Sequence, residues 1–242
     1  MKLAIQTLFA LAVAAVTAWG FAAPPAKGFP EPNLARIIFF HLPCAIGSSL
    51  FLIYAAYAAV RTVLRHGPDW DRKAVSAMEL GFVLTVLTLI TGMLFARYQW
   101  GTWWDWQEIR MTSYLLVFLL VGAYFALRSA IPDAERRVRV SAVYVIAALL
   151  PCFVLIFVAP RLPQFQSLHP DVVGKGGFDA TYNSVFLSTF SLVFIACVWI
   201  FRLRLKTARL DAQLENLHAK LADRDRPAYP RMVEPIRIPR DG

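Results

Sequence analysis

Charged residues are scarce in this sequence. They make up 17% of its 242 residues, whereas hydrophobic residues make up 58% and the mean hydropathy is +0.52. An ordinary soluble domain carries about 25% charged and about 45–50% apolar residues. This composition excludes a disordered chain, argues against a water-soluble enzyme, and indicates an integral membrane protein.

Cysteine pairs and the common catalytic motifs are also missing. Cys44, Cys152 and Cys197 form no C-x-x-C pair, so neither a disulfide scaffold nor thiol–disulfide exchange is expected. The sequence has no H-E-x-x-H or G-x-S-x-G motif, and the glycine-rich run 174–177 lacks the other residues of a phosphate-binding P-loop. No metalloprotease, serine hydrolase or nucleotide-binding chemistry is therefore predicted.

The sequence instead contains long apolar runs, each close to the length of about 20 residues that a helix needs to cross a bilayer. None of them alternates apolar and polar residues like a strand of an outer-membrane barrel. We therefore predict an all-α, polytopic membrane bundle of six transmembrane helices. The first run also resembles a signal peptide, and we expect it to be retained. The predicted spans are residues 3–22, 37–60, 75–95, 111–130, 139–159 and 182–201.

Basic residues lie mostly on one side of these spans. If the N-terminus is inside, the N-terminal segment, the inner loops and the C-terminal tail together hold 19 of the 25 Lys and Arg residues. Cytoplasmic loops of membrane proteins carry such an excess, so both termini are predicted to be cytoplasmic. The net charge of +9 is then explained by topology, and no nucleic-acid binding is predicted.

The composition changes after the sixth span, which separates a transmembrane part, residues 1–201, from a cytoplasmic part, residues 202–242. The second part is predicted to form a short amphipathic helix followed by a Pro-rich basic tail. We interpret the helix as a solvated juxtamembrane segment, with docking of a partner as the alternative. Its heptad-like leucines are Leu210, Leu214, Leu217 and Leu221.

Tryptophan is concentrated on the predicted outer side. Four of the seven tryptophans lie within seven positions between the third and fourth spans. An interfacial aromatic belt distributes tryptophans over all helix ends, whereas this loop holds more than half of them. A packed aromatic surface favours a large flat ligand, because ring stacking adds to the energy of burial. The interfacial belt stays as the alternative.

Two of the four histidines lie on the same outer side. His41 is about one turn inside the outer end of the second span, and His169 lies in the outer loop 160–181, which is long enough to cover a site. Two neutral imidazoles beside an aromatic surface can supply both axial ligands of a heme iron. A structural core histidine and a solvated loop histidine are the respective alternatives. His66 and His218 fall among charged residues on the inner side and are expected to be solvated.

These segments resemble a known family. Residues 36–43, R-I-I-F-F-H-L-P, match the pattern R-I-I-x-x-H-x-P, and residues 100–113 are similar to W-G-T-W-W-x-W-D-x-R-L-T-S. Residues 167–169, S-L-H, correspond to a second histidine segment. Over roughly residues 30–200, the sequence resembles the heme-handling (WWD-motif) proteins of cytochrome c maturation, and among them the CcmC branch, the heme exporter protein C family.

The sequence departs from the family pattern at acidic positions. The Asp that follows the last tryptophan in the family is Gln107 here, with Asp105 and Glu108 nearby and one residue inserted before Arg110. The Glu that often follows T-S in the family is Tyr114. The role of any single acidic residue in this segment is therefore left open.

The resemblance implies a function in cytochrome c maturation. Such proteins hold b-type heme non-covalently at the outer face of the inner (cytoplasmic) membrane and deliver it to a periplasmic heme chaperone, CcmE. They act beside the ABC-transporter-like CcmA and CcmB and a small membrane protein, CcmD. The resemblance also implies that His41 and His169 bind the iron and that this chain is a carrier rather than an enzyme. The other heme contacts that it implies are Trp100, Gly101, Trp103, Trp104, Asp105 and Trp106, with Arg36 and Arg110 near the propionates.

Two other functions are left open. A CcsA-like component of a synthetase ligates heme to apocytochrome, but such chains usually have more spans and a second histidine pair within the membrane. A b-type membrane redox protein needs histidine ligands at both leaflets, whereas this sequence offers one outer pair. Heme delivery is therefore favoured over both.

Overall fold

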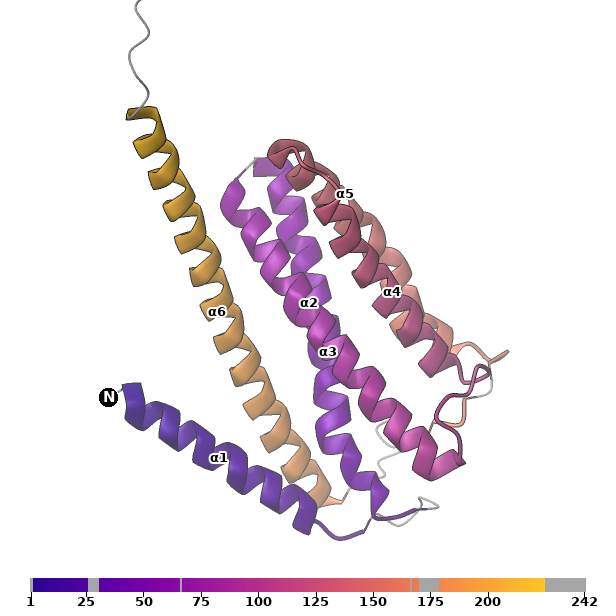
Figure 1. Cartoon of the computed structure of the whole chain (residues 1–242). Coiled ribbons are helices and arrows are strands. Elements are labelled where there is room, and N and C mark those ends of the chain that lie inside the picture. Colours follow the sequence, from indigo (N-terminus) through magenta and orange to yellow (C-terminus); the bar gives the residue numbers. More distant parts are fainter. Residues whose placement is uncertain (1, 26–30, 66, 166, 170–178, 225–242) are drawn as a thin grey trace, which may run out of the picture. The chain divides into compact units, whose positions relative to one another are not determined.

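The computed structural model describes residues 2–25, 31–65, 67–165, 167–169 and 179–224, which are helical apart from short connections and include no strand. A 3-10 turn, η1 (Leu34–Ile37), precedes the second helix, and a π-helical segment, η2 (Val154–Val158), and a 3-10 turn, η3 (Ala159–Arg161), extend the fifth. The helices in Figure 1 are α1 (Lys2–Ala22), α2 (Ile38–Arg65), α3 (Pro68–Trp100), α4 (Ile109–Ser129), α5 (Ala134–Phe153) and α6 (Ala180–Arg224).

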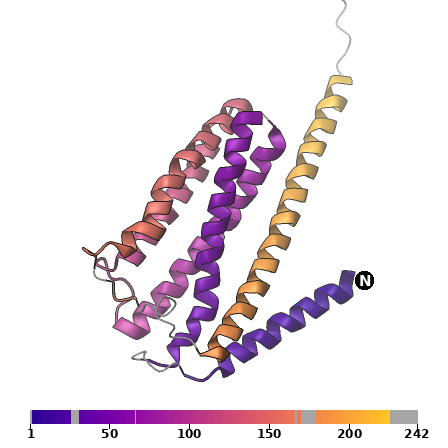
Figure 2. The same cartoon turned by 180° about the vertical axis from the view of Figure 1, so that it is seen from behind.

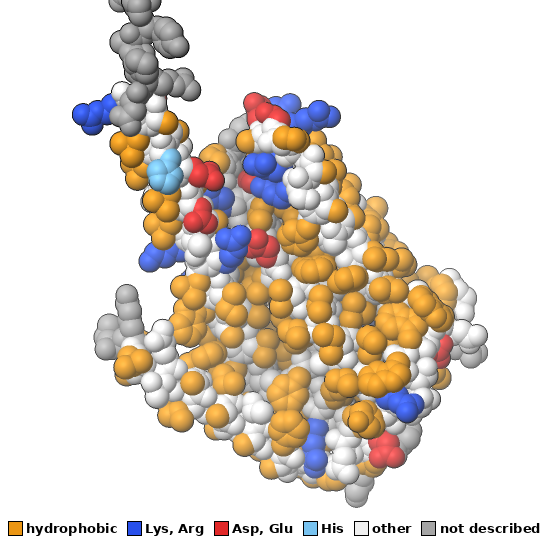
Figure 3. Space-filling view, in the orientation of Figure 1, with side chains coloured by type: hydrophobic (Ala, Val, Ile, Leu, Met, Phe, Trp, Pro, Cys, Tyr) orange, Lys and Arg blue, Asp and Glu red, His pale blue; other side chains and the backbone are white. Residues whose placement is uncertain are grey.

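Within the described residues, six helices are long and apolar enough to cross a membrane, as the sequence predicts. Figure 3 shows hydrophobic side chains over the visible face of α2 to α5, with charged side chains gathered toward the two ends of these helices. A bilayer requires this distribution, because charged groups are costly in the hydrocarbon core and favourable at its surfaces. The prediction of an all-α membrane bundle with six spans is confirmed, and the chain is a multi-pass membrane protein.

Several helices extend beyond the predicted spans. α3 begins at Pro68 rather than at residue 75, because proline is favoured in the first turn of a helix and Asp69 and Asp71 complement the helix dipole there. It ends at Gly101, whose φ of +79° lies in the left-handed region, where a glycine is not strained. The glycine of the tryptophan segment therefore terminates α3 and starts the loop.

The helices α2, α3, α4 and α5 lie side by side as a bundle (Figures 1 and 2), in which α2 packs mainly against α3 and α5. Glycines allow α2 and α3 to approach closely. A Cβ atom at Gly47 would lie 3.1 Å from Leu84, and one at Gly81 would lie 3.3 Å from Leu52. Close packing of this kind holds helices together in a bilayer, where helices and lipid tails are equally apolar.

The first part of α6 contacts the bundle through a small number of long side chains. The rings of Phe39 and Tyr182 have centroids 5.0 Å apart, and those of Tyr54 and Phe201 are 5.5 Å apart. In the half of α3 that begins at Pro68, Glu79 accepts two hydrogen bonds from the guanidinium of Arg204 at 2.7 and 2.8 Å. These contacts hold α6 to α2 and α3 at separate levels of the membrane.

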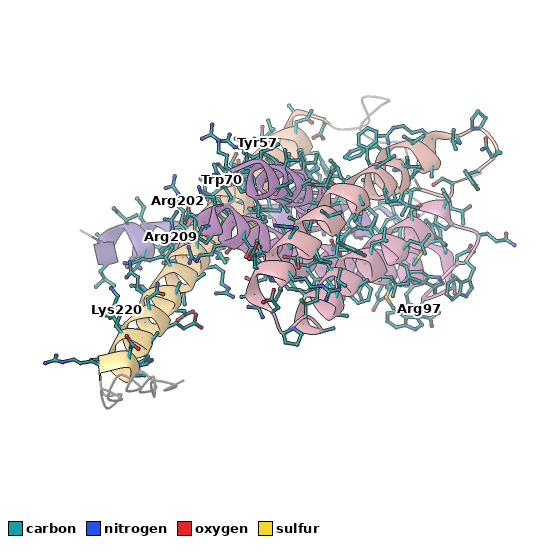
Figure 4. The ribbon with its side chains drawn as sticks, turned by 90° about the horizontal axis from the view of Figure 1, so that it is seen from above. Tyr57, Trp70, Arg97, Arg202, Arg209 and Lys220 are labelled. Carbon is teal, nitrogen blue, oxygen red and sulfur yellow. The ribbon has the colours of Figure 1, made fainter. Side chains whose placement is uncertain are left out.

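The end of the bundle between α2 and α3 carries the predicted inner charges. Arg128 of α4 donates two hydrogen bonds to Asp71 of α3 at 2.9 and 2.7 Å. Tyr57 and Trp70 lie beside one another (Figure 4), and the guanidinium of Arg61 lies 4.6 Å from the Trp70 ring centre. Aromatic and basic side chains together are typical of a membrane–water interface.

The chain divides into two compact units, Met1–Leu205 and Lys206–Gly242. In the second unit α6 continues as a helix to Arg224, and its heptad leucines are about half exposed. The amphipathic segment is thus a continuation of the sixth membrane helix, because no glycine or proline interrupts residues 180–224. The Pro-rich tail from residue 225 onward, His66, Lys27 and Lys175 lie outside the described residues.

Candidate functional site

A cavity of about 840 Å³ lies at the end of the bundle where α2 begins and α3 ends. Its walls come from α2, α3, α4, η2, η3 and the segment 167–169. The volume is in the range of small-molecule and cofactor sites, which are typically apolar with a few converging polar groups. The polar side chains in its wall are His41, Ser49, Thr88, Arg110, Tyr114, Arg161, Ser167 and His169.

His41 reaches the cavity from the first turn of α2. Its Nδ1 lies 2.8 Å from Oγ1 of Thr91 on α3. The Thr91 hydroxyl donates its one proton to the backbone carbonyl of Leu87 at 2.7 Å, so toward His41 it acts as an acceptor. The imidazole proton is therefore on Nδ1, and the lone pair of Nε2 is available to a ligand or metal.

His169 reaches the same cavity from the segment that precedes α6. Its ring centre lies 6.3 Å from that of His41 and 6.0 Å from that of Phe95. Burial, together with the positive charge of Arg110 and the nearby His41, lowers the pKa of His169 to about 3. The imidazole is therefore neutral at physiological pH, which is the state that metal binding requires.

The segment that carries His169 is held in place by the carboxylate of Glu108. Its Oε1 accepts a hydrogen bond from the Ser167 hydroxyl at 2.7 Å, and its Oε2 accepts one from the Leu168 N–H at 2.6 Å. The same Oε1 caps α4 by accepting from the Arg110 N–H at 3.2 Å. Glu108 is only 1% exposed, and a buried carboxylate is tolerated because such charge-assisted hydrogen bonds compensate its desolvation. One side chain thus joins the tryptophan loop, α4 and the His169 segment.

The side chains of Asp105 and Thr102 form hydrogen bonds within the tryptophan loop. Asp105 Oδ1 accepts from the Gln107 N–H at 2.8 Å, and the Thr102 hydroxyl donates to the Trp104 carbonyl at 2.9 Å. Side-chain bonds of this kind stabilise tight turns. Of the acidic and amide candidates that the sequence left open, Glu108 is therefore the one that contacts the His169 segment.

The four tryptophans of the loop divide between the cavity and the surface. Trp100 lines the cavity, and its ring lies edge-on to Phe95 with centroids 5.6 Å apart. Trp103 and Trp106 are 53% and 72% exposed, and Trp104 packs against Trp106 at 5.5 Å. The aromatic surface expected from the sequence thus has one tryptophan in the cavity wall, two on the exposed surface of the loop, and Trp104 half-buried beside Trp106.

The two arginines predicted for the carboxylates of a ligand lie in different places. Arg110 lines the cavity from the first turn of α4, whereas Arg36 is absent from the cavity wall. The Arg36 Nε donates to the Ala23 carbonyl at 2.8 Å and joins η1 to the segment after α1. Arg161, to which the sequence assigned no role in the site, lines the cavity from η3. Two cations, Arg110 and Arg161, therefore accompany the two imidazoles.

This arrangement suits a metal that arrives with most of its ligands already bound. In the part of the chain that the structure describes, no three His, Cys, Asp or Glu residues gather closely enough to hold a bare metal ion. A heme iron needs only axial ligands from the protein. Two imidazoles on opposite sides of one metal, each with a metal–nitrogen distance of about 2 Å, have ring centres about 6 Å apart. The 6.3 Å between His41 and His169 is close to that separation.

The chain matches known proteins in sequence. The family model described as heme exporter protein C (CcmC) matches residues 1–222. Heme exporter protein C of Escherichia coli (strain K12) is 35% identical over 153 residues, which cover 61% of this chain and 59% of that protein. The protein of the same name from Paracoccus denitrificans is 32% identical over 118 residues, which cover 48% of this chain and 47% of that protein. The one from Bradyrhizobium diazoefficiens is 29% identical over 175 residues, which cover 72% of this chain and 64% of that protein.

The aligned segments thus span about half to two thirds of the length of these relatives. The family model, in contrast, covers nearly all of this chain, from the first helix through the continuation of α6. The chain belongs to the heme exporter protein C family.

Proposed function

We propose that this protein is a heme carrier of cytochrome c maturation, and that it holds b-type heme non-covalently between His41 and His169. The observation that carries the proposal is the pair of neutral imidazoles, 128 positions apart in the sequence, that line one cavity at a separation suited to two axial ligands. Membership of the heme exporter protein C family supports it.

The charges in the cavity also support heme as the substrate. Heme carries two propionates, which are costly to bury unless cations meet them. The planar guanidinium of an arginine can donate two parallel hydrogen bonds to a carboxylate. We assign the propionates to Arg110 and Arg161, which line the cavity, and assign to Arg36 the positioning of η1. Most of the remaining wall is apolar and suits the macrocycle.

The carrier is proposed to work at the outer face of the inner membrane. The basic end of the bundle then lies in the cytoplasm together with both termini, and the cavity, at the opposite end, faces the periplasm. Heme would pass from there to a CcmE-like chaperone, for which the exposed rings of Trp103 and Trp106 offer an aromatic contact. CcmA- and CcmB-like transporter subunits and a CcmD-like small membrane protein are the further partners proposed. The chain acts as a carrier and not as an enzyme, because no covalent bond of this chain is made or broken.

The spectrum of the purified protein tests the proposal. Wild-type protein from heme-replete cells that also produce its partners should show a low-spin, six-coordinate heme spectrum and a b-type pyridine hemochrome. His41→Ala or His169→Ala should lower heme occupancy or convert the spectrum to a five-coordinate form. His218→Ala removes an exposed histidine of α6 and serves as the matched control. A double His41→Ala/His169→Ala variant with the wild-type low-spin spectrum would overturn the proposal.

A further inference from the structure

The helix of the second unit carries a row of leucines along one face. Leu210, Leu214, Leu217 and Leu221 follow one another at intervals of four, three and four positions, and they are 48%, 54%, 55% and 54% exposed. These intervals place them at successive d and a positions of a heptad repeat, the pattern by which two helices pair as a coiled coil. Covering a row of half-exposed leucines is favourable, so this face is an interaction surface.

The apolar stripe that the leucines form is narrow. On the opposite face, the f positions hold the small residues Ala212 and Ala219. A stripe confined to a and d positions is typical of a coiled-coil seam. A helix that lies on a membrane surface instead has a polar face rich in Lys and Arg, whereas residues 206–224 hold four Lys or Arg and three Asp or Glu residues. A second helix therefore fits this face better than a lipid surface does.

The charges beside the leucines match those of a second copy of the same helix. All copies of a membrane protein share one orientation, so their α6 helices run in the same direction and can pair only in parallel. In a parallel coiled coil, a residue at position g faces the partner's residue at position e, five positions further on. Lys206 is at a g position and Asp211 at the following e position, so two copies in register form this ion pair twice. Lys220 and Asp225 repeat the spacing in the sequence, and residue 225 lies outside the described residues.

The same face of α6 is also exposed at the end of the first unit. Ile200 and Leu203 continue the heptad spacing toward the N-terminus, and they are 52% and 53% exposed. There α6 contacts α2 and α3 through other residues, Phe201 and Arg204. The bundle thus does not cover this face of α6.

We propose that two copies of this chain pair through Leu210, Leu214, Leu217 and Leu221 as a parallel, in-register coiled coil. The seam is short, and a helical segment of this length is marginal in water on its own. Two copies in one membrane, however, meet at a high effective concentration, because their spans hold the two helices on the same side and in the same direction. The seam shares no residue with the cavity, so the pairing is independent of the proposed heme binding.

Oxidative cross-linking of the full chain in its native membranes tests the pairing. Leu217→Cys places a thiol in the seam, where the two copies of a d position lie within reach of a disulfide, and should give a covalent dimer of twice the chain mass. Ala219→Cys, on the opposite face of the same turn, is the matched control. It should give no more dimer than wild type, which retains Cys44, Cys152 and Cys197. Cross-linking of Leu217→Cys that does not exceed this control, or a product that contains a different protein, overturns the proposal.

Exchanging the two charges tests the register. Lys206→Asp or Asp211→Lys sets like charges against each other in both ion pairs. Either change should raise the dimer dissociation constant, measured by dilution into lipid vesicles, about 2–30-fold, which corresponds to about 0.4–2 kcal/mol for two exposed pairs. The combined variant Lys206→Asp/Asp211→Lys restores opposite charges and should return the constant to its wild-type value. A combined variant that dimerises as weakly as the single ones contradicts the parallel, in-register arrangement.

Discussion

Replacing Glu108 with Gln is expected to release the segment that carries His169. The carboxylate accepts from Ser167 and Leu168 through different oxygens, and Oε1 also accepts from the Arg110 N–H. Glutamine keeps one oxygen and replaces the other with an NH₂ group. If the NH₂ group faces Leu168, it meets the Leu168 N–H, and two donors then face each other. If it faces Ser167, the Ser167 hydroxyl can rotate and accept from it. In that orientation, however, the Arg110 N–H loses its acceptor.

Either orientation leaves one backbone N–H at a partly buried position without an acceptor, which costs about 1–3 kcal/mol. Because Ser167 and Leu168 belong to the segment itself, the cost falls on its docking when the NH₂ group faces Leu168. A change of that size lowers the docked population of the segment about 5–150-fold relative to the undocked one. His169 should then leave the cavity more often, and heme retention should fall with it.

Hydrogen–deuterium exchange of heme-free protein in nanodiscs measures this docking directly. The Leu168 amide of Glu108→Gln should exchange faster by that factor, and heme-loaded protein should gain a five-coordinate component. Asp105→Asn is the matched control, because it makes the same chemical change in a side chain that bonds to its own loop. Leu168 protection equal to wild type in Glu108→Gln would show that something other than this carboxylate holds His169.

Two further predictions concern groups around the ligand. Thr91→Val removes the acceptor of the His41 Nδ1 proton and should weaken heme affinity in a titration about 10–100-fold, as loss of such orienting partners does at metal sites. Thr85→Val, whose hydroxyl bonds within its own helix, should bind like wild type, and equal affinity of both variants would contradict the role of Thr91. Arg161→Ala should reduce heme retention by about 1.5–3 kcal/mol without changing the low-spin spectrum. Arg36→Ala should retain heme like wild type, and an equal loss in both would place Arg36 back in the site.

The membrane bundle could be predicted from the sequence because its causes are local. A transmembrane helix satisfies its own backbone hydrogen bonds and needs a minimum apolar length, so composition and run length indicated six helices. The helix ends were predicted less well. Pro68 and Gly101 bound α3 through caps and backbone dihedral angles, and these lie in polar sequence outside the apolar run. The continuation of α6 past residue 205 likewise follows from an uninterrupted helical sequence and not from hydrophobicity.

The types of residue in the site were also visible in the sequence. His41, His169 and Trp100 stand in short motifs whose residue types suit heme, and the structure brings all three to one cavity. The arginines show the limit of such reasoning. Arg36 and Arg161 both lie near helix ends on the same side, and each donates to a backbone carbonyl. Only the tertiary structure shows that Arg161, and not Arg36, lines the cavity.

Glu108 was the residue that the sequence left open. It immediately precedes α4 and stands two positions before Arg110, so both a helix cap and the spacing of the motif's Asp, counted back from its Arg, could have indicated it. Its contacts to Ser167 and Leu168, however, cross 59 and 60 positions of the chain. The sequence shows that a carboxylate is present at position 108. Only the tertiary structure shows which hydrogen-bond donors that carboxylate binds.

The sequence by itself therefore determined the helices, their number and the residues able to bind a metal. Those properties depend on side-chain chemistry and on backbone neighbours within a few turns. The tertiary structure decided which side chains share a cavity and which nitrogen of His41 is free. These properties depend on contacts such as that between His41 and Thr91, 50 positions apart, and such contacts form only when separate helices pack.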